Sequence, residues 1–328
     1  MRDSVTVRQR RAWMLCAGSV PAVIACAGIG WQWALLGGAA AAAILWLCAR
    51  MQAELGGQTL PECGQAVLGK TGWQIAAAAA SIWAVLVLAR VTREAGRAFP
   101  ESHDPIGLGL ALLALAAVAC RNGELVPARC AGVLASVLGG LYAVLLLACA
   151  QEADVQWMQP WGDVRQGAAA CGYLLLPGAG WYLRARPAGK PGGGWTAVIS
   201  GAAPAVLAVV TGGCLSPRLA AMEELPFYEA VKGLRGPTVL QRLEPLASAA
   251  MLLGYFCAMT LLLCTAGSAV DARAKQWRYL LPAFCAGAAS IIAERLNKTI
   301  WIVGGTVFWG GIPLGILLVG YCRKKQKK

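Results

Sequence analysis

The sequence predicts an all-α membrane protein with ten transmembrane helices, arranged as two five-helix repeats of opposite topology. The composition is 58% hydrophobic and only 14% charged, with a mean hydropathy of +0.58, which is far more apolar than an ordinary soluble domain. The apolar residues gather in ten segments of roughly the 20 residues that a membrane-spanning helix needs. The first and the sixth segments are each interrupted by glycine and proline. Such paired interruptions indicate an inverted-repeat fold with a binding site near the bilayer midplane.

The ten segments follow one another with short connections and therefore predict a single polytopic domain over residues 1–328. They run roughly over 12–30, 31–49, 72–93, 104–120, 127–149, 166–183, 194–214, 243–267, 278–294 and 300–321. The first five would form repeat one, about 12–149, and the last five repeat two, about 166–321. The predicted fold therefore has broken helices 1 and 6 and ends in a basic tail, 322–328.

The charged residues predict that both termini lie in the cytoplasm. With that orientation most of the 29 Lys and Arg residues fall on the inner side, and most of the 16 Asp and Glu residues fall on the outer side. This distribution follows the positive-inside rule. The net charge of +13 is then a consequence of topology, and no nucleic-acid partner is expected. The basic tail, 322–328, is expected to contact anionic lipid.

The cysteines and the single histidine predict neither a metal site nor a disulfide framework. Most of the 13 cysteines lie within or at the ends of apolar segments, where cysteine behaves as a small apolar residue. The chain contains no CxxC pair, and His103 is its only histidine. It also has no mid-membrane carboxylate pair and no phosphate-binding loop. We therefore expect no catalytic residues, no cofactor and no enzyme activity.

Two connecting loops carry signals for further helices. On the inner side, the run Thr59-Leu60-Pro61-Glu62 combines a capping threonine, an early proline and a glutamate three residues later, which is typical of a helix start. On the outer side, the loop 215–242 contains an amphipathic run, Leu225–Lys232. We expect this run to form a short helix that lies flat at the outer interface.

The first interruption, Gly18-Ser19-Val20-Pro21, provides one half of the predicted binding site. An unwound helix in the membrane is tolerated only where its backbone lines a cavity or is covered by protein. The half-helix after the break would offer N–H groups and a positive dipole end to a ligand carboxylate, with Ser19 as a further donor. The alternative is a simple proline kink, with Ser19 hydrogen-bonded to its own helix.

The second interruption, Pro177-Gly178-Ala179-Gly180, would face the first and direct carbonyl groups at a ligand ammonium group. The alternative for Pro177, Gly178 and Gly180 is close helix packing through small residues. Trp83 in the third segment and Tyr255 in the eighth lie near mid-bilayer by residue count. Either ring could form a wall of the site or simply pack in the core.

Charged residues flank two of the predicted spans. Arg90, Arg93 and Glu94 close the third span, and Arg242 and Glu244 open the eighth. Ionisable residues inside a membrane are functional candidates by default, but near span ends snorkelling or surface pairing is the expected explanation. A structural or subunit-docking role is expected for the block that contains Phe227, Tyr228, Glu229, Arg242 and Glu244.

Three stretches resemble one known family. They are LPFYEAVKGLRGPTVLQRLEPL (Leu225–Leu246), LGGQTLPECGQAVLGKTGWQI (Leu55–Ile75) and REAGRAFP (Arg93–Pro100). Together they resemble the B subunit of spore germinant receptors, a spore germination permease family related to amino acid–polyamine–organocation transporters. The resemblance runs from about Val7 to Cys322. One departure is that the family often carries an acidic residue in span six, and the stretch Leu174–Arg184 has none.

The resemblance implies a LeuT-like fold of ten spans and a site for a nutrient germinant, typically an amino acid. It also implies assembly with the A and C subunits of the receptor in the inner membrane of the bacterial spore. The predicted function is therefore recognition of a small germinant between spans one and six, backed by spans three and eight. Occupancy would shift a conformational balance that the partner subunits detect.

Two alternatives stay open from the sequence. The first is a cation-coupled amino acid secondary transporter, although no acidic residue lies well inside a predicted span to build a proton relay. The second is a structural membrane subunit whose interrupted helices only pack. Uptake of solute by the purified protein would distinguish the transporter from the receptor, and a lack of any ligand would indicate the structural subunit.

Overall fold

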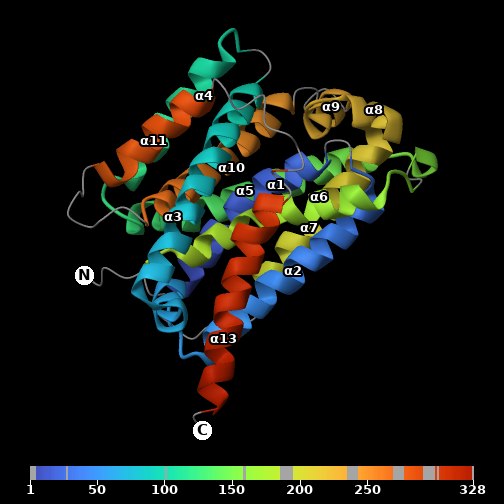
Figure 1. Ribbon diagram of the computed structural model, residues 1–328. Helices are drawn as coiled ribbons and strands as arrows, with labels where there is room; N and C mark the ends of the chain where they lie inside the picture. Colours follow the sequence, from blue (N-terminus) through green and yellow to red (C-terminus); the bar gives the residue numbers. More distant parts are fainter. Residues whose placement is uncertain are drawn as a thin grey trace.

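The computed structural model describes residues 5–26, 29–99, 102–157, 160–184, 195–234, 243–268, 277–290, 300 and 303–326, and the elements in these ranges are helices (Figure 1). They are α1 (Val7–Cys26), α2 (Trp31–Glu54), α3 (Leu60–Arg97), α4 (Pro105–Cys120), α5 (Leu125–Glu152), η1 (Val155–Trp157), α6 (Val164–Leu174), η2 (Leu176–Tyr182), α7 (Trp195–Leu215), α8 (Pro217–Met222), α9 (Pro226–Lys232), α10 (Glu244–Ala266), α11 (Trp277–Ser290), η4 (Gly305–Gly311) and α13 (Ile312–Gln326). The segments η1 and η2 are 3₁₀ helices, and η4 is a π-helix.

Five helical runs in the described part of the chain are long and apolar enough to cross a membrane. They are α2, α3, α5, α10 and the continuous run Gly305–Gln326 that η4 and α13 form. Shorter apolar helices are α4 and the part of α7 from Gly201 to Leu215. The other predicted segments also coincide with helices, namely α1, α6 with η2, and α11. An all-helical membrane protein is thus supported, while the count of ten spans and the inverted repeat stay predictions.

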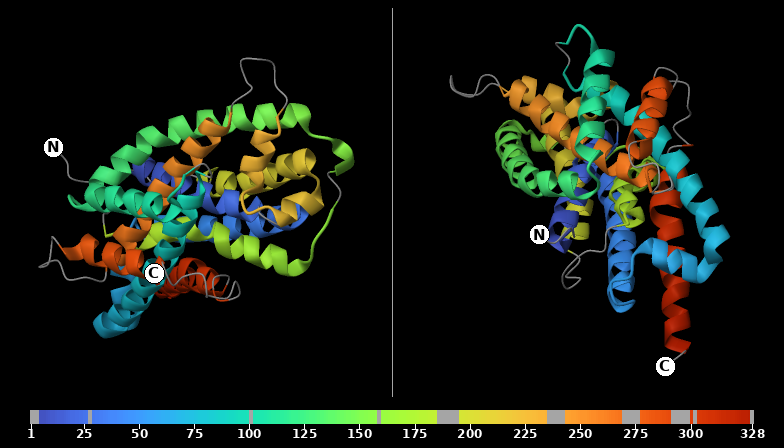
Figure 2. Two further views of the ribbon diagram at one scale, coloured as in Figure 1. Left: turned by 90° about the horizontal axis from the view of Figure 1, so that it is seen from above. Right: turned by 90° about the vertical axis from the view of Figure 1, so that its left-hand side faces the viewer.

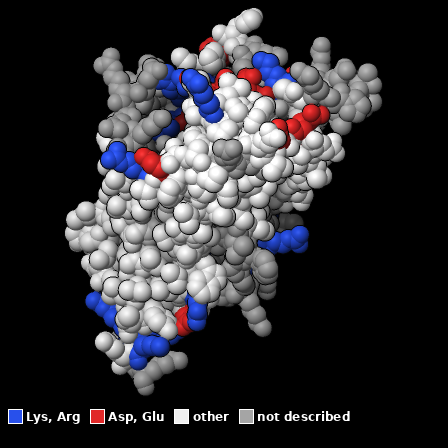
Figure 3. Space-filling model, turned by 90° about the vertical axis from the view of Figure 1, so that its right-hand side faces the viewer, with Lys and Arg blue, Asp and Glu red and all other residues white. Residues whose placement is uncertain are grey.

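The surface agrees with a position in a lipid bilayer. On the face that Figure 3 shows, charged side chains gather mainly toward the two ends, and a broad zone between them is largely uncharged. Large apolar side chains such as Ile75, Leu147 and Phe284 are exposed. Extensive apolar exposure of this kind marks a surface that something other than water covers.

The helix α10 lies at the centre of the protein. Every residue from Cys257 to Ala266 is buried, and α10 packs against α1, α3, α4 and α5. Trp13 of α1 is fully buried, and its indole N–H is shared between the hydroxyl group of Thr260, at 3.0 Å, and the carbonyl group of Cys257, at 3.2 Å. A buried indole needs such a partner. This contact therefore fixes α1, near the start of the chain, against α10 of the second half.

Glycine contacts bring α2 close to α6 and α7. A Cβ atom added to Gly38 would overlap the carbonyl group of Gly201, and one added to Gly201 would lie 2.5 Å from the carbonyl oxygen of Gly38. Gly37 faces α6 in the same way, against the carbonyl oxygen of Gly167 and the side chain of Ala170. Small residues that allow backbones to touch are the usual means of packing helices in a membrane, where water does not drive association.

The helix α3 begins as the sequence predicts. The carboxylate group of Glu62 accepts a hydrogen bond of 2.8 Å from the backbone N–H of Thr59, which completes the predicted helix start. Gly69 then adopts a φ of 74°, which separates residues 60–68 from the long second part of α3. Glycine adopts this left-handed conformation without the steric penalty of a side chain. The kink therefore lets one helix include both a short segment before the bend and a long apolar segment after it.

The C-terminal helix α13 runs beside α2 and α3 to one end of the protein (Figures 1 and 2). There Lys324 donates a hydrogen bond of 2.7 Å to the carbonyl oxygen of Glu54, and Arg323 donates one of 3.1 Å to that of Ala66. Basic side chains near the last carbonyl groups of a helix complement its dipole. Part of the basic tail thus contacts the protein itself, in addition to any contact that its other residues make with lipid.

The predicted interruption of the first segment is wrong for the described residues. The run Gly18-Ser19-Val20-Pro21 lies inside the continuous helix α1, and the Ser19 hydroxyl donates a hydrogen bond of 2.6 Å to the carbonyl oxygen of Cys16. Proline has the φ of a helix and removes a single donor, and a membrane helix tolerates it when neighbouring groups compensate. The alternative with Ser19 bonded to its own helix is therefore the one observed.

The predicted interruption of the sixth segment is present. The α-helix α6 ends at Leu174, and the chain continues as the 3₁₀ helix η2 over Leu176–Tyr182 before it becomes extended at Leu183. Pro177 favours such a change because proline, which has no backbone N–H, is best tolerated in the first turn of a helix. Every residue of η2 is buried, so this irregular backbone lies within the protein, as the membrane requires.

Candidate functional site

A cavity of about 50 Å³ lies where α1, α3, α6, η2 and η4 meet, and we call it the central cavity. Val20 and Pro21 of α1 form one wall, and Gly172, Tyr173 and Leu176 form the wall at the change from α6 to η2. Gly305 and Trp309 of the π-helix η4 close a third side. Single π-helical turns occur frequently at functional sites because they turn side chains out of the regular helical order.

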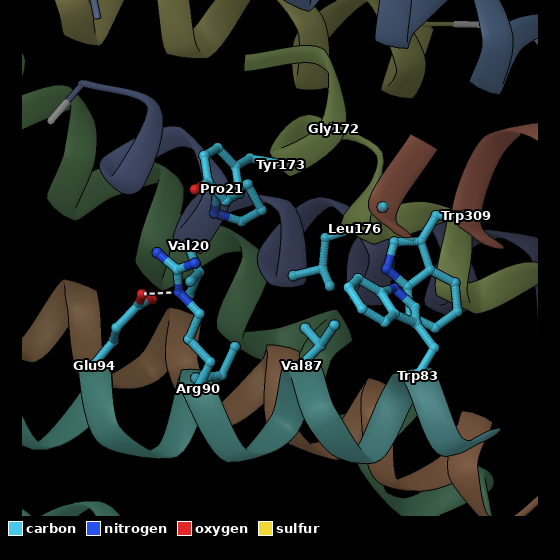
Figure 4. Close-up of a pocket in the computed structure, with 12 residues that line it drawn as sticks. Val20, Pro21, Trp83, Val87, Arg90, Glu94, Gly172, Tyr173, Leu176 and Trp309 are labelled. Atoms are coloured by element: carbon cyan, nitrogen blue, oxygen red, sulfur yellow. Dashed lines mark hydrogen bonds and ion pairs between the residues drawn. The ribbon is translucent and has the colours of Figure 1, made fainter. Parts of the chain in front are cut away.

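The helix α3 contributes the fourth wall. Figure 4 shows Trp83, Val87, Arg90 and Glu94 in a row along one side of α3, facing α1 and α6. Their spacing of four, three and four residues places them on one face of an α-helix. Close approach of η4 fixes the Trp83 ring, because a Cβ atom added to Gly304 would overlap that ring. The ring also stacks on Phe308, with 5.7 Å between centroids.

Arg90 and Glu94 form a charge pair in this otherwise apolar cavity. The guanidinium Nε lies 2.6 Å from Oε1 of Glu94, and the guanidinium carbon lies 5.5 Å from the centre of the Tyr173 ring. The two side chains are only 24% and 20% exposed. The second carboxylate oxygen of Glu94, Oε2, is buried and has no hydrogen-bond partner among the described residues. One carboxylate oxygen of Glu94 is therefore held by Arg90, whereas the other, Oε2, lacks a hydrogen-bond partner among the described residues.

The sequence favoured snorkelling or surface pairing for Arg90 and Glu94; the structure shows the pair, but α3 continues to Arg97 and the two side chains are largely withdrawn from the surface beside the central cavity. The sequence contained a signal: two opposite charges four residues apart that follow an apolar helical segment. It could not give their depth, because depth depends on where α3 ends and on what α1 and α6 cover. Tyr173, Leu176 and Trp309 were missed altogether, since their position depends on tertiary packing.

The carbonyl groups of the sixth-segment break are already occupied. The oxygen of Ala179 accepts a hydrogen bond of 3.0 Å from the hydroxyl group of Thr265, and the oxygen of Gly180 accepts one of 2.5 Å from Arg10. Pro177 and Gly178 are buried, and a Cβ atom added to Gly178 would overlap the carbonyl group of Trp309. In this conformation the predicted residues of η2 pack and do not face the central cavity directly.

The predicted residues of the first segment are divided between two cavities. Val20 and Pro21 line the central cavity, as does the predicted Trp83. Gly18 and Ser19 line a second cavity of about 190 Å³, between α1, α5 and α7. Its other walls are almost entirely aliphatic. Tyr255 is fully buried in α10 and lines neither cavity, so the structure favours core packing for this ring.

The arrangement of helices can be compared with known proteins. A solved structure shares this fold. It is the substrate-bound, outward-open state of a Na⁺-coupled sialic acid symporter, with a TM-score of 0.64 and 13% sequence identity over 95% of this chain and 78% of that chain. No family model and no curated protein matches the sequence. At this identity the comparison supports a transporter fold and an integral membrane protein, and it assigns no residue roles.

Within this transporter fold, Arg10 connects α1 to η2 at the end that is predicted to face the cytoplasm. The Arg10 side chain is buried, and its guanidinium group lies 5.4 Å from the centre of the Trp181 ring as well as on the Gly180 carbonyl group. Its Nε and Nη1 atoms are buried without a hydrogen-bond partner among the described residues. Arg10 therefore joins α1 to η2 at this end, although part of its buried guanidinium group lacks hydrogen-bond partners among the described residues.

Two substitutions of Arg10 are expected to change the thermal unfolding midpoint differently. Arg10→Met removes the buried charge and keeps the packing of the aliphatic stem, so its thermal unfolding midpoint should equal or exceed that of the wild type. Arg10→Ala also leaves a void and should lower the midpoint. Thermal unfolding in detergent measures both. Equal loss of stability in the two variants would show that the charge itself stabilises the fold.

The predicted docking block is largely internal in its first part. Phe227 and Tyr228 are buried, and the Phe227 ring lies 6.1 Å from that of Tyr142 in α5. The short helix α9 is thus confirmed, with one face packed against α5, α7 and α10, and its position flat at the outer interface stays a prediction. Glu229 and Glu244 are partly exposed, and Arg242 lies outside the described residues. A docking role for the exposed members stays a prediction.

Metal binding finds no support in the described ranges, where no group of three or more His, Cys, Asp or Glu side chains could hold an ion. Cysteine thiols that do approach each other lie in apolar surroundings, as with Cys120 and Cys264, whose sulfur atoms are 3.7 Å apart. These side chains pack between α4 and α10. What the arrangement offers chemically is a small, mostly apolar cavity with one charge pair in its wall.

Proposed function

We propose that the protein binds a small nutrient solute in the central cavity and signals occupancy to A and C subunits, as the B subunit of a spore germinant receptor. The observation that carries the proposal is a mostly apolar cavity beside a helix interruption, and this cavity contains one largely buried charge pair, Arg90 and Glu94. Sites for small molecules combine apolar walls with a few placed polar groups. The resemblance of residues 55–75 and 225–246 to the receptor family supplies the biological context.

The proposed mechanism is a shift between two conformations. In the structure the cavity of about 50 Å³ is much smaller than the roughly 300–1,000 Å³ of typical small-molecule sites. A solute therefore enters only after α1, α3 or η2 move apart. A ligand shifts such an equilibrium only by its differential affinity for the two states. Arg10 holds α1 against η2 near the start of α1, whereas Val20 and Pro21 of the same helix line the central cavity. A movement of α1 that opens the cavity can therefore also change the contact between Arg10 and η2.

A cation-coupled amino acid transporter is the second candidate, and the observation in its favour is the symporter fold of the matched structure. Both candidates require a solute site, and neither involves a chemical conversion. They differ in whether bound solute reaches the other side of the membrane. A structural subunit is the third candidate and predicts no ligand at all.

A thermal-shift screen of the detergent-purified chain against amino acids, nucleosides and sugars tests the proposal. A ligand that binds only the folded state stabilises it by about 2.7 kcal/mol at a concentration of 100 Kd. We expect a selective rise of the unfolding midpoint with one class of compound. Counterflow of the same compound, labelled, in proteoliposomes then separates the candidates. Steady uptake supports the transporter, binding without uptake supports the receptor, and a well-folded protein that no compound stabilises contradicts both.

A further inference from the structure

We propose that Arg90 and Glu94 together recognise a zwitterionic solute, with the ligand carboxylate on the Arg90 guanidinium group and the ligand ammonium group on Glu94. This inference rests on the proposed function, since it concerns the same central cavity. The resemblance already implies an amino acid as ligand, and the new step is the assignment of the two residues that select its charged groups. The sequence placed these residues at a span end and gave them no part in the site.

The contact between Arg90 and Glu94 itself contributes little to the architecture, although Arg90 also lies over the Tyr173 ring of α6. Both residues belong to α3 and are four positions apart, so their contact joins no two elements of the fold. Exposed pairs with this spacing stabilise a helix by about 0.3–0.5 kcal/mol. Here both charges are largely withdrawn from water, and withdrawing a charge costs several kcal/mol unless its hydrogen bonds are completed. The buried Oε2 of Glu94 has no such partner among the described residues. A bound ammonium group would complete it.

The net charge of the pair selects the class of ligand. Arg90 and Glu94 neutralise each other, and Val20, Val87 and Leu176 around them carry no charge. A zwitterion presents one charge to each partner and leaves the cavity neutral. An anion would satisfy Arg90 but leave Glu94 without its counterion, and a cation would do the reverse. At low effective dielectric such an uncompensated charge is strongly unfavourable.

Tyr173 holds the arginine in position for this role. The Arg90 guanidinium group lies over the Tyr173 ring, whose helix α6 ends directly before the 3₁₀ segment η2. Figure 4 shows Tyr173 opposite the Arg90 side chain, on the other side of the cavity from α3. A ring in this position attracts a cation through the negative potential of its face. A ligand carboxylate that draws on Arg90 would thus alter the contact between α3 and α6, next to the interruption.

The size of the cavity favours the smallest zwitterions. Apart from the charge pair, its walls are apolar and include the rings of Trp83 and Trp309. With about 50 Å³ of space, glycine and alanine demand the least opening. L-Alanine is the better probe because two analogues of nearly the same shape each lack one of its charges. Propionate lacks the ammonium group, and L-alaninamide lacks the carboxylate group.

The test measures the affinity of the full chain in detergent for glycine, L-alanine, propionate and L-alaninamide, by the shift of the unfolding midpoint with concentration. We expect the zwitterions to bind at least about tenfold more tightly than either analogue, since each analogue leaves one charge of the pair without its ligand partner. Glu94→Gln should weaken L-alanine about tenfold or more and remove its advantage over propionate. Arg90→Gln should do the same with respect to L-alaninamide.

Arg97→Gln is the matched control. It breaks an ion pair on the same helix, with Glu224 at 3.3 Å, but lies outside the cavity and should leave L-alanine affinity unchanged. If a glutamine variant does not fold, Arg90→Lys and Glu94→Asp keep the charges but move them. These variants should weaken binding and preserve the preference for zwitterions.

The outcomes separate this inference from the proposed function. Equal affinity for L-alanine and its analogues, or unchanged affinity in both glutamine variants, overturns the zwitterion site. Binding of a sugar or a nucleoside alone also overturns it, while the proposed function survives. A well-folded protein that no compound stabilises overturns both.

Discussion

Gly201→Leu is expected to prevent stable folding. Gly201 of α7 touches the backbone of α2, where its Cβ would lie 2.5 Å from the carbonyl oxygen of Gly38 and 2.7 Å from Cβ of Ala42. Neither neighbour can yield, because one is backbone within a helix and the other is attached directly to it. Inserting even a few carbon atoms into a packed core costs about 1–3 kcal/mol, and a leucine against backbone should exceed that range. The monodisperse fraction after size-exclusion chromatography and the unfolding midpoint measure the loss.

Gly212→Leu provides the matched control on the same helix. No atom outside the immediate chain lies within 4 Å of a Cβ atom at Gly212, so a leucine there meets open space. Replacing glycine inside a helix also removes a conformational penalty of roughly 0.5–1 kcal/mol. The control should therefore fold as well as the wild type or slightly better. If both variants give the same monodisperse fraction and midpoint, the close contact between α2 and α7 is not a requirement of the fold.

The helices could be predicted from the sequence because their signals are local. A run of apolar residues must be helical in a membrane, where each backbone group needs an internal partner. The start of α3 at Thr59 and Glu62 and the short helix α9 follow from capping and spacing alone. The interruption at Pro177 was also predictable, because glycine flanks the proline on its C-terminal side. These features depend on neighbours along the chain.

The course of α1 was not predictable in the same way. Pro21 can break a helix or simply bend it, and the choice depends on whether nearby groups compensate for the missing donor. In the structure the Ser19 hydroxyl group bonds within its own helix, and the Ser19 side chain packs against Gly254 of α10. A hydrogen bond and a helix contact thus both support α1 near Pro21. Gly254 is more than 200 positions away, and no local pattern indicates that the two helices touch there.

The site shows the same division. Val20, Pro21 and Trp83 were predicted as site residues and do line the central cavity. Their signals are local: Val20 and Pro21 belong to a run with glycine and proline, and Trp83 is a large ring near the middle of an apolar segment. Trp309 reaches the cavity only because η4 is π-helical, and a π-helical turn has no simple sequence signal. The roles of Arg90 and Glu94 depend on depth, which the sequence gives only relative to an assumed span end. The local signals thus located the site approximately, and tertiary packing decided its membership.

Gly178→Ala is expected to abolish ligand binding while the protein still inserts and folds. The added methyl group would overlap the carbonyl group of Trp309 and so push η2 away from η4. Trp309 and Leu176, which line the central cavity, belong to these two segments. The hydrogen bond of 2.8 Å from the Tyr182 hydroxyl to the Phe308 carbonyl oxygen joins the same two segments and would be strained. We expect the unfolding midpoint to fall, by an amount equivalent to about 1–3 kcal/mol, and the ligand-induced shift to disappear.

Gly180→Ala tests whether the effect comes from this contact or from any methyl group in η2. The nearest atoms to a Cβ at Gly180 are Cγ and Sδ of Met14, at 3.0 and 3.2 Å, and methionine is flexible enough to move aside. This variant should keep both its stability and its ligand response. Loss of response in both variants would make the whole 3₁₀ segment intolerant of side chains. Retention in both would separate the η2–η4 contact from solute binding, because the cavity would then tolerate movement of one of its walls.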